Sequence, residues 1–184
     1  MLITDLEDAV HIEQNQMLKG AALGNYMWRS PEAHAEGPME MPSDMFAFGI
    51  VVRSRQSVCY DNNPADVAQC IYVLTTHVIF ALKDPDMPEV DKVASVYLRH
   101  LTHFADECGT RGFLDYLGAE HPMLDVFEAV EEAFKDMPKK PFTEMLGSDV
   151  DDDFKDLVGS VTKLDPRRRI TAQEALAHKW FRDA

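Results

Sequence analysis

Two groups of side chains in this sequence have the types and spacing of metal ligands. In the first, His100 and His103 stand three positions apart, on one face of a helix, and Cys108 follows them. Imidazole and thiolate groups together could hold a zinc ion. Two histidines at this spacing on an amphipathic helix are more often packing or surface residues, so we assign no metal to this group.

The second group is acidic. Asp149, Asp151 and Asp153 have the spacing with which a calcium-binding loop begins. Such a loop needs glycine at its sixth position and glutamate at its twelfth, where this chain has Phe154 and Ser160. The loop could therefore neither turn nor complete its coordination. The run instead predicts the first turn of a helix, where acidic residues favour the helix dipole.

Four further segments are more informative together than any one alone. They are Asp5-Leu6-Glu7, Gly24 to Glu32 (GNYMWRSPE), Ser43 to Gly49 (SDMFAFG) and Leu164 to Phe181 (LDPRRRITAQEALAHKWF). Their order and spacing resemble the C-terminal lobe of eukaryotic protein kinases, most closely those of the Ser/Thr type. In that family an Asp-Phe-Gly motif opens the activation segment and an Ala-Pro-Glu motif closes it. The resemblance covers both ends of the chain, whereas residues 53–145 match only loosely.

The resemblance implies a structural role for two residues far apart in the chain. In the family, the glutamate of the closing motif pairs with the arginine of an Asp-Pro-x-x-Arg motif. Glu32 and Arg169 hold these positions, which implies a largely buried ion pair. Loss of one partner would leave a buried charge uncompensated and cost about 3 to 5 kcal/mol. An exposed pair would contribute almost nothing.

Two aspartates also correspond to family positions, each with a simpler alternative. Asp44 resembles the aspartate that holds the catalytic loop's backbone, and it could equally well only cap its helix. Asp5 corresponds to the magnesium ligand, but Glu7 replaces the usual glycine and adds a second negative charge. The alternative for Asp5 is a turn carboxylate at the end of a strand. ATP and magnesium serve complete family members, and we expect no cofactor for this chain alone.

Several parts that phosphoryl transfer requires are absent from the sequence. There is no Gly-x-Gly-x-x-Gly and no His-Arg-Asp segment, and the N-terminal lobe is expected to be absent. Asn25 replaces the usual threonine, and Tyr26 is the one hydroxyl acceptor between Leu6 and Arg29. Catalysis by this chain alone is therefore not expected. The alternatives are a pseudokinase-type module that binds a protein partner through its helical lobe or activation segment, and a truncated gene model of a complete kinase-like protein.

The pattern of apolar residues predicts a mainly α fold in one partial kinase-like domain over residues 1–184. Periodic apolar positions favour helices at residues 89–106, 121–135, 150–163 and 171–178, after an apolar helix that Ser43 or Asp44 could cap. In the terms of the family, residues 5–32 form the activation segment and residues 43–82 the helix F region. Helices G and H then fall within 89–163, and the final helix within 171–181.

An abrupt polar segment interrupts the helix F region. Removing residues 52–69 joins the flanks into one uninterrupted apolar helix. The segment begins with valine, which a GT codon encodes, and ends with glutamine, which a CAG codon encodes, as a retained in-frame intron would. A natural loop insertion is the alternative, and Pro64 would then force the loop to protrude.

Composition excludes several classes of partner. The chain has 184 residues, with 32 acidic against 18 basic side chains and a formal net charge of -14. This charge disfavours nucleic acid and anionic membrane surfaces, which bind through Lys and Arg. Three cysteines without a Cys-x-x-Cys pair indicate a reducing, intracellular compartment, cytoplasmic or nuclear. The acidic start does not resemble a secretory signal, and the apolar run over residues 67–82 is too short to span a bilayer.

Overall fold

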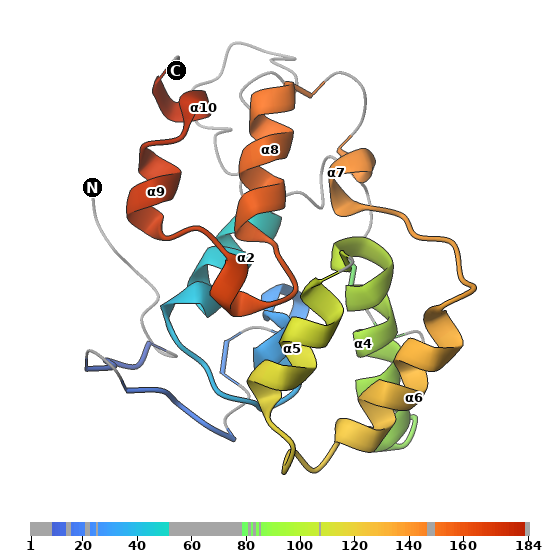
Figure 1. Cartoon of the computed structure of the whole chain (residues 1–184). Coiled ribbons are helices and arrows are strands. Elements are labelled where there is room, and N and C mark those ends of the chain that lie inside the picture. The colour runs from blue at the N-terminus through green and yellow to red at the C-terminus, as the bar shows by residue number, and fades with distance from the viewer. Residues whose placement is uncertain are drawn as a thin grey trace.

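The computed structural model describes residues 9–13, 16–20, 23–24, 26–51, 79–80, 82, 84, 86–106, 108–146 and 150–182. These residues are mainly helical (Figure 1), so the predicted mainly α fold is confirmed. Their β structure is limited to one antiparallel bridge between Leu18 and Met39. Asp5, Glu7, Asn25, Asp149 and residues 52–69 lie outside the described residues. No helix of the described part is both long and apolar enough to cross a membrane.

The helices follow one another along the chain without an intervening strand in the described residues. Two are short 3-10 helices, η1 and η2, and the others are α-helices. The bounds are η1 Tyr26–Trp28, α1 Pro31–His34, α2 Met41–Val51, α4 Glu89–Phe104, α5 Gly109–Leu117, α6 Leu124–Phe134, α7 Phe142–Met145, α8 Asp152–Val161, η2 Pro166–Arg168, α9 Ala172–Leu176 and α10 Lys179–Arg182.

The helices expected at 89–106, 121–135 and 150–163 are present as α4, α6 and α8, each somewhat shorter than expected. Helices α5 and α7 were not expected from the sequence. The expected final helix is divided into α9 and α10 by Ala177 and His178. This break lets the Trp180 ring pack 5.2 Å from the Phe154 ring of α8.

Helix α2 begins at Met41, three residues earlier than a Ser43 cap would allow, so neither Ser43 nor Asp44 caps it. Pro42 occupies the second position, where its fixed φ suits a helix and its missing N–H is not needed. The Ser43 hydroxyl instead hydrogen-bonds to the Ser30 hydroxyl at 2.7 Å. The capping alternative for Asp44 is therefore wrong, because this residue lies inside the first turn.

Helix α4 contributes to two of the three apolar clusters that the described residues form. Val96 and Phe104 face a cluster shared with α2, α7 and α8, whereas Tyr97 and Leu101 face a cluster shared with α5 and α6. Figure 1 shows the same division, with α7 and α8 in the upper half and α5 and α6 below. At Gly49, α2 approaches α8 so closely that a Cβ would come within 2.5 Å of Val161 and Thr162 side-chain carbons.

Candidate functional site

Two segments that lie far apart in the chain meet at a buried ion pair. Ser30 caps α1 by accepting a hydrogen bond from the Ala33 N–H, which places Glu32 in the first helical turn. Arg169 follows η2 and donates from Nη1 to Glu32 Oε1 at 2.6 Å and from Nη2 to Oε2 at 2.8 Å. Both side chains are almost fully buried, at 0% and 1% exposure. The structure thus brings together the two residues that the family resemblance had paired.

The rest of the Arg169 guanidinium is committed to backbone carbonyls. Its Nε donates to Lys163 O at 2.7 Å, Nη1 also donates to Pro42 O at 2.9 Å, and Nη2 also donates to Leu164 O at 3.1 Å. The guanidinium carbon lies 4.9 Å from the centre of the Phe46 ring. A guanidinium has five N–H donors, and each has an acceptor here. We call Glu32, Arg169 and these carbonyls the arginine clamp, which joins α1, α2 and the segment before η2.

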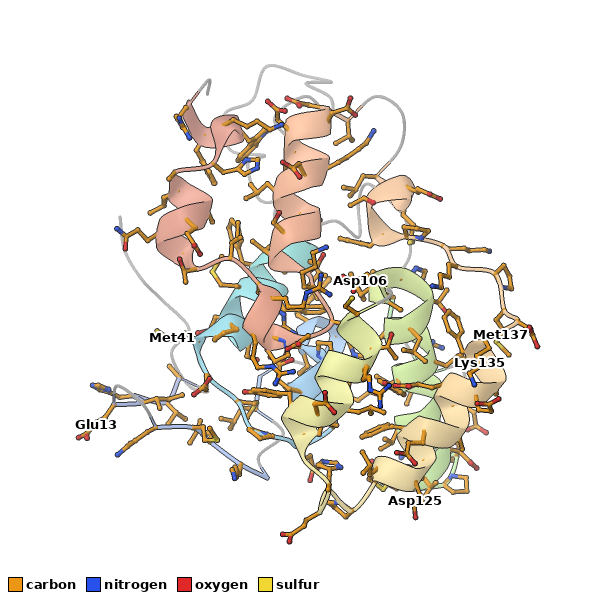
Figure 2. All side chains as sticks on the ribbon, in the orientation of Figure 1. Glu13, Met41, Asp106, Asp125, Lys135 and Met137 are labelled. Atoms are coloured by element: carbon orange, nitrogen blue, oxygen red, sulfur yellow. The ribbon has the colours of Figure 1, made fainter. Side chains whose placement is uncertain are left out.

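The two arginines before Arg169 fasten α5. Arg167 donates to Asp165 and also to the Gly112 carbonyl at 2.6 Å, while Arg168 donates to Asp106 Oδ1 at 2.6 Å. Figure 2 labels Asp106 near the start of α5. Burial alone would raise the pKa of Asp106, but hydrogen bonds from Arg168 and from the Gly109 N–H lower it overall. Three consecutive arginines therefore bind three different parts of the lobe.

A cleft of about 360 Å³ lies beside the clamp, at the start of α2. Its lining includes Trp28, Arg29, Glu40 and Asp44. Asp44 as a whole is exposed to solvent. The protein around its carboxyl group nevertheless removes part of the water there, and this desolvation raises the pKa of Asp44. Within the described residues, its side chain makes no hydrogen bond or ion pair. It therefore presents a carboxylate to the cleft.

Arg29 is the one basic residue that lines this cleft in the described part of the chain. Its Nε donates to the carbonyls of Leu23 and Gly24, both at 2.9 Å. Its guanidinium carbon lies 5.8 Å from the centre of the Tyr26 ring. The side chain thus holds the turn before α1 in place.

The histidines set aside as metal ligands point to different partners. His100 is buried and bonds to His34, a residue of α1, whereas His103 Nδ1 lies 2.8 Å from Lys140 O. Cys108 is an exposed free thiol. Among the described residues, no three His, Cys, Asp or Glu side chains gather as metal ligands would. The His34–His100 contact had no signal in the sequence, because neither residue stands in a motif that would pair it with the other.

The family model of the protein kinase domain matches residues 1–181. The chain therefore belongs to the protein kinase domain family, and the resemblance seen in the sequence is confirmed. A search of curated proteins found no match.

Proposed function

We propose that this chain is the helical lobe of a Ser/Thr-type protein kinase domain and that, by itself, it does not transfer phosphate. The arginine clamp supports the first part, since it fixes the segment that ends at Glu32 against α2 and η2. The second part rests on the cleft. Its described lining includes the carboxylates Glu40 and Asp44, while the Nε of Arg29 is committed to carbonyls.

Electrostatics explains why this cleft suits a nucleotide poorly. Kinases hold the triphosphate with a glycine-rich loop, a lysine and magnesium, and they need an aspartate to accept the substrate hydroxyl proton. Carboxylates next to a triphosphate repel it unless cations intervene. If another polypeptide supplied the missing parts, ATP and magnesium would be the cofactors and protein hydroxyls the acceptors. The net charge of -14 favours protein over nucleic acid as the macromolecular partner.

Thermal denaturation of residues 1–184 with increasing ATP and magnesium tests the proposal. ATP at a concentration of 100 times its Kd would stabilise the fold by about 2.7 kcal/mol, so even weak saturable binding would raise Tm visibly. We expect no saturable rise in Tm and no transfer of labelled phosphate to a generic protein substrate. The Glu40→Gln, Asp44→Asn double variant is the matched control, because it removes both carboxylates. Saturable stabilisation of the wild-type chain by ATP would overturn the claim of inactivity.

A second candidate function, a protein-binding module, is favoured by the rim of the same cleft. Met41 is 78% exposed and Val10 is 49% exposed, and both line the cleft together with Glu40 and Asp44. This combination suits a partner segment that carries apolar and basic residues. Met137 is also exposed, but it lies beyond α6, far from Met41 in Figure 2.

Substitution at these two methionines tests the module. We expect Met41→Glu to abolish capture of a specific partner, and Met137→Glu to leave that capture unchanged. Equal recovery with both variants, or no specific partner with the wild-type chain, would count against the module.

A further inference from the structure

Two histidines connect the η1 turn, Tyr26–Trp28, to helices α1 and α4. His34 ends α1 and His100 lies within α4. His34 Nδ1 is 2.9 Å from His100 Nε2, and His34 Nε2 is 2.9 Å from the carbonyl oxygen of Tyr26. The two rings therefore form a continuous chain of hydrogen bonds from the turn to α4.

The hydrogen-bond partners determine where the protons lie. The Tyr26 carbonyl can only accept, so His34 carries its proton on Nε2 and its Nδ1 is an acceptor. His100 must then donate from Nε2, which leaves the lone pair on its Nδ1. That nitrogen is buried and has no hydrogen-bond partner in the described residues. At neutral pH the pair thus exists as two neutral rings with one unmatched acceptor.

Burial opposes an additional proton on His34 more strongly than the backbone groups of Tyr26 and Ser30 favour it. The His100 ring packs against Phe80, Phe46 and Phe104, with ring centres 4.3, 5.7 and 6.0 Å away. The charged and titratable groups that influence the buried side of the pair are Arg29 and Tyr26 from the turn, His103 from α4 and Arg169 from the segment after η2. On the groove side, His34 faces Glu36, Glu89, Lys92 and His121. Glu32 of α1 is already bound in the clamp to Arg169. The groove beside His34 also holds the carboxylates of Glu36 and Glu89, but neither bonds to His34 in the described structure, and Glu89 pairs with Lys92 at 3.4 Å.

Solvent reaches one ring but not the other. His34 lines a groove of about 480 Å³ together with the cations Arg29 and Lys92 and the carboxylates Glu36 and Glu89, whereas His100 is only 1% exposed. A proton would therefore arrive at His34 Nδ1 first. There it would oppose the proton on His100 Nε2 across the same short contact. His100 could relieve this only by moving its proton to Nδ1, where no acceptor lies.

We propose that the His34–His100 pair is an acid-sensitive latch that holds the Tyr26–Trp28 turn against α4, and that proton uptake by His34 releases the turn. Released from His100, the charged His34 ring turns toward the groove and water and loses the Tyr26 carbonyl. The device does not depend on the proposed kinase-related function.

The electrostatics of the two rings agrees with this geometry. Burial, the largest influence, lowers the pKa of His34 to about 4, and Arg29 opposes its protonation as well. Burial also lowers the pKa of His100 well below its usual value, with His34, Arg169 and His103 adding to the effect. A ring that is neutral when latched and has an ordinary pKa when released couples release to proton uptake.

Hydrogen exchange of backbone amides 26–34, corrected for intrinsic rates, measures release of the turn. With a pKa of about 4 when latched and 6.5 when released, the opening equilibrium should rise about 20-fold between pH 7 and pH 5. The His34→Gln variant keeps one donor and one acceptor but does not titrate, so its opening should stay constant. The control His178→Gln removes a histidine beside Asp156 and should behave as the wild-type chain does.

Two outcomes would overturn the latch: no pH-dependent opening in the wild-type chain, or equal pH dependence in His34→Gln. Nitrogen NMR of labelled histidine rings in the wild-type chain gives a test that needs no variant. We expect both rings to carry their proton on Nε2 at pH 7, and His34 to charge only as the turn opens. A charged His34 in a closed turn would equally refute the proposal.

Discussion

Helix α1 contributes one residue to each of two buried polar clusters, and the clusters are satisfied in opposite ways. Glu32 meets Arg169 as a pair of full charges in which every guanidinium N–H has an acceptor. His34 meets His100 as two neutral rings, and one ring nitrogen has no partner among the described residues. The clusters stand only two positions apart on the same short helix.

The difference follows from the cost of burying each kind of group. An ion taken out of water costs several kcal/mol unless its partner and additional hydrogen bonds compensate for it. A neutral acceptor without a partner costs less, about 1 to 3 kcal/mol. The stability that the clamp provides should therefore be lost on substitution. The stability that the histidine pair provides should depend on pH. Four predictions test this contrast.

The largest effect is expected from the clamp. Arg169→Ala would leave Glu32 buried without its counter-charge and several carbonyls without donors, so we expect a loss of about 3 to 5 kcal/mol in the free energy of unfolding. Arg168→Ala is the matched control, because that side chain is 40% exposed and binds Asp106. It should cost about 1 kcal/mol or less. Urea denaturation measures both, and similar losses would contradict the importance of burial.

The histidine pair should make stability depend on pH. The pKa of His34 is about 4 in the folded chain against 6.5 when unfolded, so the unfolded chain binds the proton first as pH falls. Stability is therefore fully present above pH 6.5, falls as pH drops through 6.5, and levels off below about 4. The full loss is about 3 kcal/mol. Denaturation at pH 7 and pH 5 should show a drop that His34→Gln reduces, and an equal drop in both chains would contradict this assignment.

The sequence predicted the fold class and the long helices because periodic apolar residues depend on local spacing. Helices α4, α6 and α8 each present such a period to the core. The start of α2 was predicted incorrectly. Ser43 was treated as a local cap, whereas its hydroxyl bonds to Ser30, which precedes α1. A tertiary contact thus replaced the local one.

The site was predictable to the extent that it followed a family motif. Glu32 and Arg169 could be paired only because both stand in recognisable segments. The acceptors of the five Arg169 donors were not evident from spacing. Arg167 and Arg168 carried a weak signal as two charges beside an Asp-Pro turn. His34 and His100 carried none, since a buried histidine contact has no sequence period and no neighbour to mark it. Such contacts depend on how α1 and α4 pack.

A third prediction examines the unmatched nitrogen. His100→Phe removes the buried acceptor and places an apolar ring among Phe46, Phe80 and Phe104. The substitution removes one unpaired acceptor, His100 Nδ1, and leaves another, His34 Nδ1, so the two costs are similar. We expect stability at pH 7 to change by no more than about 1 kcal/mol, and its pH dependence to weaken. A loss as large as that of Arg169→Ala would mean that the histidine pair supports the fold as strongly as the clamp.

The smallest effect isolates ion pairing from burial. Lys135 and Glu132 form an ion pair one turn apart on the surface at the end of α6, with side chains 66% and 73% exposed, and Figure 2 labels Lys135 there. Water already solvates both charges, so their attraction is weak and salt-screened. Lys135→Ala should change the free energy of unfolding by less than about 0.5 kcal/mol, and a double-mutant cycle with Glu132→Ala should give a coupling energy no larger. A coupling energy near that of the clamp would show that charge pairing itself, rather than burial with every donor matched, gives Glu32 and Arg169 their strength.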